Sequence, residues 1–95
     1  MKIRFTPTAY ADIDSVYDYI AADSPTAAQK TLDQIENMID HLADHPQLGK
    51  QGRIKNTRGL IVPNTAYIVA YELDQEHIDI LAIIHSKRRW PSKFN

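Results

Sequence analysis

The sequence predicts an α+β domain in which a helical hairpin packs on an antiparallel sheet, in the order β-α-α-β-β-β. Three observations support this fold class. Thr6-Pro7 and Ser24-Pro25 each precede apolar residues at helical spacing, and the period changes to extended segments after residue 49. The length of 95 residues, without repeat or linker, predicts a single domain over residues 1–95.

The first strand and the first helix have clear boundary signals. Residues 2–5 alternate and include Ile and Phe, which indicates a short strand that joins the sheet. Thr6 is a favoured helix cap and Pro7 suits the first helical position, so we expect a helix from Pro7 to near Ala22. The spacing places three acidic residues on its outer face: Asp12, Asp14 and Asp18.

The second helix repeats the same start signal. Ser24-Pro25 begins it, and Pro46 stops it. Its apolar stripe comprises Ala28, Leu32, Ile35, Met38, Ile39 and Leu42. Because only Ala22 and Asp23 connect the helices, they must form an antiparallel hairpin.

The second half of the chain is β-rich. A turn-rich basic loop over Gly49–Gly52 precedes three extended segments with short turns between them: Arg53–Val62, Ala66–Leu73 and His77–Ser86. Such short connections favour antiparallel pairing. We expect four tyrosines in the core between helices and sheet: Tyr10, Tyr17, Tyr67 and Tyr71.

Composition points to a reducing compartment and a charged partner. The chain has no cysteine, no apolar secretion signal at its N-terminus and no run long enough to span a membrane, so we expect a cytoplasmic protein. The net charge of −1 hides an asymmetry. Residues 1–48 carry three basic and eight acidic side chains, and residues 49–95 carry eight basic and four acidic ones. This pattern is consistent with a polyanion or acidic partner, or with an acidic helical face and scattered basic loops.

Several stretches, in order along nearly the whole chain, resemble the RelE/ParE family of toxins from bacterial toxin–antitoxin pairs. The order of predicted elements is also that of the family. The stretches that carry the similarity are Phe5-Thr6-Pro7 with Ala9 and Asp12-Ile13, Asp18-Tyr19-Ile20, Ser24–Ala28, the Pro-x-x-Gly-x-x-Gly-Arg loop at Pro46–Arg53, Thr57–Val62 (with Gly59 in the usual Glu position), Tyr67–Tyr71 and Ile84–Pro91.

The resemblance implies a growth-inhibiting toxin that a cognate antitoxin neutralises in a hetero-oligomer, with operator DNA contacted only through the antitoxin. RelE-like members cut messenger RNA on the ribosome, whereas ParE-like members inhibit DNA gyrase and are not nucleases. Nuclease members often have an Arg directly after the first aromatic residue of the Tyr67–Tyr71 strand, where this chain has Ile68. Their C-terminal catalytic Tyr is also absent, because Trp90 and Phe94 stand near that point. We therefore favour the ParE-like branch and expect no catalytic residues.

The alternative is a ribosome-dependent mRNA endonuclease. In that case His85 would act as acid or base, and Arg58 and Arg88 would bind phosphate. A third alternative is a toxin-fold module that has lost activity and acts in complex formation and transcriptional autoregulation.

The predicted binding surface consists of two basic segments that the fold can bring together. We expect this surface to bind the target or the antitoxin and to include an exposed aromatic side chain. Its residues are Arg53, Lys55, Arg58, Lys87, Arg88, Arg89 and Trp90. A solvated basic surface is the plainer interpretation. The remaining histidines, His41, His45 and His77, show no metal-ligand spacing, so we expect neither a metal nor a cofactor.

Overall fold

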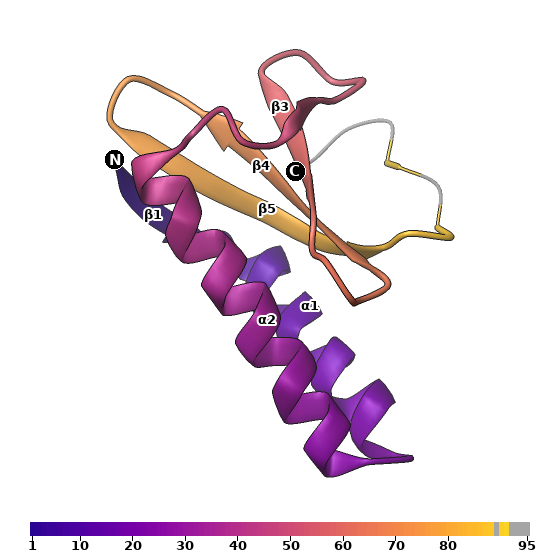
Figure 1. Ribbon diagram of the computed structural model, residues 1–95. Coiled ribbons are helices and arrows are strands. Elements are labelled where there is room, and N and C mark those ends of the chain that lie inside the picture. The colour runs from indigo at the N-terminus through magenta and orange to yellow at the C-terminus, as the bar shows by residue number, and fades with distance from the viewer. Residues whose placement is uncertain (89, 92–95) are drawn as a thin grey trace.

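A computed structural model describes residues 1–88, 90 and 91 (Figure 1). It confirms the α+β class, with two antiparallel helices on one face of a sheet. The elements are β1 (Lys2–Phe5), α1 (Pro7–Ala21), α2 (Pro25–Asp44), β2 (Lys50–Gln51), β3 (Thr57–Ile61), β4 (Tyr67–Leu73) and β5 (His77–His85). The two-residue strand β2 was not predicted, since its residues lie in the expected loop.

The five strands form one sheet in the order β1-β5-β4-β3-β2. Strands β2 to β5 pair antiparallel, as their short connections predict. The sheet is nevertheless mixed rather than wholly antiparallel, because β1 pairs in parallel with β5, from Lys2 opposite His77 to Phe5 opposite Ile80. Two helices and three strands separate β1 from β5 along the chain, so no tight turn fixes the direction of this pair.

Both predicted helix starts are confirmed in atomic detail. The Thr6 hydroxyl oxygen accepts the Ala9 backbone N–H at 3.2 Å, and the Ser24 hydroxyl oxygen accepts the Ala27 N–H at 3.1 Å. Thr6 also donates its hydroxyl hydrogen to the carbonyl oxygen of Ile80 at 2.9 Å. This side chain therefore caps α1 and joins it to β5.

The main core lies between the helices and the sheet. Its large buried side chains include Ile35, Ile39, Leu42, Leu60, Val62, Val69, Tyr71, Ile78 and Ile80. Tyr67 and Tyr71 are buried as predicted, and Tyr17 is half-buried. The prediction for Tyr10 was wrong: it is 61% exposed and stacks on Phe5 with ring centroids 5.2 Å apart.

A smaller apolar cluster covers the opposite, outer face of the sheet. It comprises Ala70, Leu81, Ala82, Ile84 and Trp90. Trp90 packs close to β3, because a Cβ atom placed on Gly59 would lie 3.3 Å from its ring. Trp90 is thus half-buried in the sheet's outer cluster and not the exposed aromatic that the sequence predicted.

The segment expected to be extended over Arg53–Val62 is shorter in the structure. Residues 52–56 form a turn in which Asn56 has a left-handed φ of 66°, and β3 begins at Thr57. The Thr57 hydroxyl donates to the Ile54 carbonyl oxygen at 2.6 Å and closes this turn. Within the described residues, neither helix is long and apolar enough to cross a membrane.

Candidate functional site

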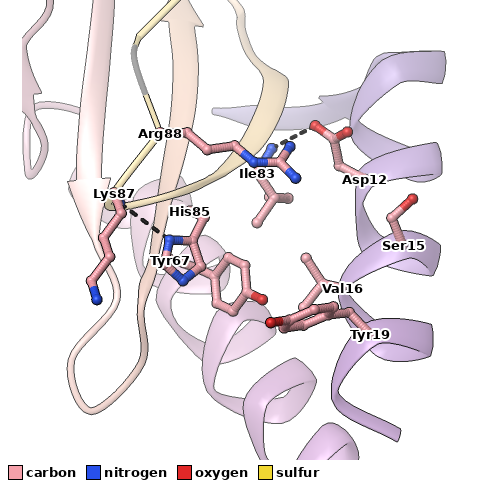
Figure 2. A pocket seen from close by; sticks show the side chains of 9 residues that line it. All are labelled: Asp12, Ser15, Val16, Tyr19, Tyr67, Ile83, His85, Lys87 and Arg88. Atoms are coloured by element: carbon pink, nitrogen blue, oxygen red, sulfur yellow. Dashed lines mark hydrogen bonds between the residues drawn. The ribbon is translucent and has the colours of Figure 1, made fainter. Parts of the chain in front are cut away.

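A cleft of about 490 Å³ opens between α1 and the adjoining ends of β4 and β5 (Figure 2). The two strands meet there because Tyr67, the first residue of β4, is paired with His85, the last of β5. The cleft is lined by Asp12, Ser15, Val16, Tyr19, Tyr67, Ile83, His85, Lys87 and Arg88. It combines aromatic walls with several hydrogen-bond donors.

Asp12 fixes one side of the cleft. One of its carboxylate oxygens accepts the backbone N–H of Ile83 at 3.0 Å. Strand β1 pairs only with residues 77–80 of β5, so Ile83 lies beyond its end, and α1 supplies the acceptor that a neighbouring strand would have offered. Asp12 therefore faces β5 and is half-buried, contrary to the expectation that it lies on the outer face of α1.

His85 is oriented by the turn that follows β5. Its Nδ1 accepts the backbone N–H of Lys87 at 3.1 Å. A neutral imidazole that accepts at Nδ1 has its proton on Nε2, so His85 offers a donor N–H in this arrangement. Its ring stands edge-on to that of Tyr67, with centroids 5.4 Å apart.

Two tyrosine hydroxyls face each other across the cleft, one from Tyr67 and one from Tyr19 (Figure 2). Burial raises the pKa of Tyr67, the proximity of Tyr19 raises it further, and the charge of Arg88 acts in the opposite direction. The Tyr67 phenol is consequently neutral at pH 7 and remains a hydrogen-bond donor. Tyr19 is 76% exposed and forms the open wall of the cleft.

Two cations stand at the rim. Lys87 and Arg88 are exposed, and neither forms an ion pair within the described part of the chain. The Arg88 side chain extends across the cleft toward α1, whereas that of Lys87 points away from it (Figure 2). Arg88 is therefore the cation that contributes most directly to the cleft.

The three residues of the predicted nuclease set are divided between two places. His85 and Arg88 line the cleft, but Arg58 does not. The Arg58 guanidinium donates to the carbonyl oxygens of Gly49 at 2.8 Å and Gln47 at 3.4 Å. On β4, Arg58 is paired with Tyr71 and His85 is paired with Tyr67. Arg58 and His85 are therefore displaced from each other by four residues, or about 13 Å, along the strand direction.

The two segments of the predicted basic surface approach each other at one residue. Arg53 and Lys55 are exposed in the 52–56 turn. The two basic segments meet at Trp90, since Cβ atoms placed on Gly52 and Gly59 would lie 3.2 and 3.3 Å from its ring. Arg89, the remaining member of the predicted set, lies outside the described residues.

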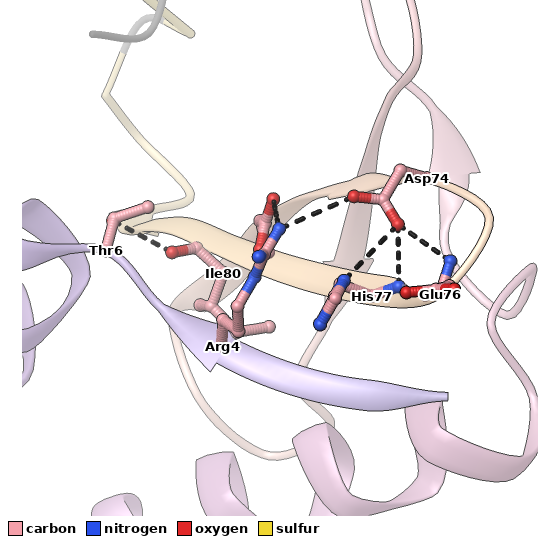
Figure 3. A network of polar contacts seen from close by, with 7 residues as sticks. Arg4, Thr6, Asp74, Glu76, His77 and Ile80 are labelled. Atoms are coloured by element: carbon pink, nitrogen blue, oxygen red, sulfur yellow. Dashed lines mark hydrogen bonds and ion pairs between the residues drawn. The ribbon is translucent and has the colours of Figure 1, made fainter.

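A second group of charged side chains lies where β1 meets the β4–β5 turn (Figure 3). Arg4 contacts Asp79 at 2.7 Å and Asp74 at 3.4 Å, and His77 Nδ1 lies 3.7 Å from Asp74. The backbone N–H groups of Glu76 and His77 lower the pKa of Asp74. Across residues 1–88, 90 and 91, no three His, Cys, Asp or Glu side chains are gathered closely enough to hold a metal ion.

Sequence reasoning gave a site role to only three of the lining residues, and those it missed include three polar residues of α1: Asp12, Ser15 and Tyr19. They follow one another at spacings of three and four residues, so they form a polar stripe beside the apolar stripe of α1. That spacing is the signal that was available. The polar stripe lines a cleft only because β5 packs beside α1, and the sequence does not predict that contact.

The chain matches known toxins over most of its length. The family model of the ParE toxin of type II toxin–antitoxin system, parDE, matches residues 3–90. Putative toxin Y4kP of Sinorhizobium fredii is 36% identical over 90 residues, which cover 95% of this chain and 93% of that protein. Toxin RelE2 of Caulobacter vibrioides is 29% identical, over 92% of this chain and 97% of its own length.

The fold is also that of a solved toxin system. A chain of the chromosomal ParDE toxin–antitoxin system from P. aeruginosa superimposes with a TM-score of 0.79 at 24% identity, covering 90% of this chain and 95% of that one. At this identity the likeness establishes the shared fold.

Proposed function

The chain belongs to the ParE toxin family of type II toxin–antitoxin systems, and from this premise we propose that it is a ParE-like inhibitor of DNA gyrase. In this proposal the protein inhibits growth by binding its target, and it catalyses no reaction. The ParDE system that shares this fold implies a cognate antitoxin as partner. The antitoxin neutralises the toxin, and in the complex only the antitoxin contacts the operator DNA.

The separation of Arg58 from His85 is the observation that carries this proposal. Cleavage of RNA by its own 2′-hydroxyl needs a base, an acid and cations around one phosphate. Here the Arg58 guanidinium is engaged by the loop carbonyls of Gln47 and Gly49. The Nδ1 atom of His85 is likewise occupied by the Lys87 N–H.

The outer face of the sheet supports the same branch. Ile68 stands where nuclease members of the family often have an Arg, and its Cγ2 would lie 3.3 Å from a Cβ atom on Gly59. The neighbouring outer cluster is apolar and includes Ala70, Ile84 and Trp90. Neither Ile68 nor these neighbours can offer a positive charge to a phosphate.

A supercoiling assay tests the proposal. Purified toxin is incubated with gyrase, ATP and relaxed plasmid, and we expect supercoiling to fall as the toxin concentration rises. Toxin mixed beforehand with its antitoxin is the control that should restore supercoiling. Undiminished supercoiling at a large excess of toxin would contradict gyrase inhibition.

The cleft favours one second candidate, an mRNA endonuclease of the RelE-like branch. His85, Arg88 and the Tyr67 hydroxyl line a single cavity, which would supply an acid or base, a cation and a further donor. Primer extension on translated messages would then show new 5′ ends that disappear in His85→Ala. If induction does not slow growth at all, the chain is a toxin-fold module without activity.

A further inference from the structure

We propose that the cleft between α1 and β5 is a docking pocket for a segment of a partner protein that carries a single carboxylate. A carboxylate binds between Arg88 and Nε2 of His85, and the side chain next to it packs against Tyr19 and Tyr67. The identity of that partner, the antitoxin or the toxin's target, rests on the proposed function. The chemistry of the ligand follows from the residues of the cleft alone.

The balance of donors and acceptors determines the kind of ligand. The cleft offers donors at the guanidinium of Arg88, at Nε2 of His85 and at three hydroxyls, those of Ser15, Tyr19 and Tyr67. Its carboxylate, on Asp12, already accepts the Ile83 N–H. The hydroxyls can donate or accept, but the Arg88 guanidinium and the Nε2–H of His85 can only donate. A ligand that satisfies these two groups must therefore supply acceptors, and a planar carboxylate matches the fork of an Arg side chain.

The surrounding charge selects a single carboxylate over a nucleic acid. Asp12 lines the cleft, so a ligand there meets one negative charge besides the positive charge of Arg88. A nucleic acid carries a charge at every residue, and each further phosphate near Asp12 would be repelled. A peptide that carries one carboxylate can place it at Arg88 and keep the rest of its length uncharged.

The aromatic walls determine what accompanies the carboxylate. Tyr67 is 8% exposed and forms a rigid floor, while Tyr19 is a largely exposed ring whose hydroxyl faces that of Tyr67. Large aromatic side chains of this kind contribute strongly to protein interfaces once a partner excludes water from them. A cavity of about 490 Å³ accommodates one or two side chains of a segment that lies across it.

Titration of the isotope-labelled toxin with 3-phenylpropionate tests the pocket by NMR. The uncharged 3-phenylpropanamide has almost the same shape, and inorganic phosphate is a second probe. We expect the carboxylate to shift the amide signals of residues 83–88 and Tyr19, and to bind at least tenfold more tightly than either other probe. Equal binding of the amide, or tighter binding of phosphate at the same residues, would overturn the proposal.

Two variants make the titration specific. Arg88→Gln should weaken 3-phenylpropionate binding at least tenfold and leave the amide unaffected. Lys30→Gln, which removes one exposed positive charge on α2, is the matched control and should change neither. An unchanged carboxylate affinity in Arg88→Gln would contradict the assignment, and an unaltered NMR spectrum away from the cleft shows that each variant is folded.

A second measurement tests the protein partner. Dissociation constants for the antitoxin and for gyrase are compared between wild type and the double variant Tyr19→Ala/Arg88→Gln. A loss of at least tenfold for either protein supports docking in the cleft, and unchanged affinity for both overturns it. If the wild-type toxin does not inhibit gyrase, gyrase is not its target. The NMR titration with 3-phenylpropionate still tests the pocket independently.

Discussion

The hydroxyl group of Tyr71, in the middle of β4, donates to the carbonyl oxygen of Pro46 at 2.8 Å and thereby joins the loop after α2 to the sheet. The same hydroxyl oxygen accepts the backbone N–H of Gly49 at 2.8 Å. Tyr71 is fully buried, and its contact with Gly49 is made away from water. Because Arg58 donates to carbonyls of the same loop, the path from α2 to β2 is fixed from two sides.

Replacing Tyr71 by Phe should destabilise the fold. The Gly49 N–H and the Pro46 carbonyl would each lose a buried partner, which costs about 1–3 kcal/mol of unfolding free energy. Urea denaturation of both proteins measures the difference. Tyr19→Phe is the control, because an exposed hydroxyl should change stability by less than about 0.5 kcal/mol. Equal effects of the two substitutions would show that the buried contacts are unimportant.

Gly49→Ala should destabilise the protein through overpacking. Gly49 does not have a positive φ, so the effect comes from contact alone. A Cβ atom there would lie 2.7 Å from a ring carbon of Tyr71 and 2.9 Å from the backbone oxygen of Gly59, and neither neighbour is free to move. We expect a loss of about 1–3 kcal/mol in thermal or urea unfolding.

Gly59→Ala is the comparison for this overpacking. The new Cβ atom would meet side-chain atoms of Ile68 and Trp90 at 3.3 Å, a distance that small side-chain shifts can relieve. Gly59→Ala should therefore lower the free energy of unfolding by less than Gly49→Ala does. The reverse order would contradict the packing explanation.

Local signals account for the parts of the fold that the sequence predicted correctly. Thr6 and Ser24 cap helices through contacts three residues away, and short turns set the antiparallel pairs. The errors concern contacts between distant residues. The direction of β1 depends on β5, which begins 72 residues after the last residue of β1, and Asp12 faces β5 because it accepts the N–H of Ile83, 71 residues away.

Asp12→Ala should destabilise the junction of α1 and β5, whereas Asp12→Asn should not. The alanine variant leaves the half-buried N–H of Ile83 without its acceptor, at a cost of about 1–3 kcal/mol. The asparagine carbonyl oxygen still accepts this N–H at the same place. Hydrogen exchange of the Ile83 amide reports the contact directly. Slow exchange retained in the alanine variant would show that Asp12 does not protect it.

Stability should decline at alkaline pH because of the buried phenols. Burial raises the pKa of both Tyr67 and Tyr71 above the ordinary value of 10.0. In the unfolded chain these phenols ionise near pH 10, while the folded protein retains their protons, so stability is fully present below pH 10 and falls as pH rises above it. Urea unfolding between pH 8 and 11 measures this slope. Tyr71→Phe should make it shallower, and an unchanged slope would assign the effect to other groups.

The candidate site was predicted less well than the fold. His85 and Arg88 were identified from their residue types, and the cleft contains both. The guanidinium of Arg58 looked equally available in the sequence, but two loop carbonyls engage it. Residue type indicates what a side chain can do, whereas its partners in the fold decide whether it is free to do it.

His85→Gln separates binding from acid–base chemistry in the cleft. A glutamine amide nitrogen lies close to the position of imidazole Nε2 and donates a hydrogen bond as that N–H does, but it cannot take up a proton near neutral pH. If the toxin acts by binding, growth inhibition by His85→Gln should remain within a few-fold of wild type. A nuclease that uses His85 as acid or base would lose activity by about 100-fold or more. Growth inhibition is measured after induction at matched protein levels, with His85→Ala in parallel. A glutamine variant as inactive as the alanine variant would move the assignment toward the nuclease branch.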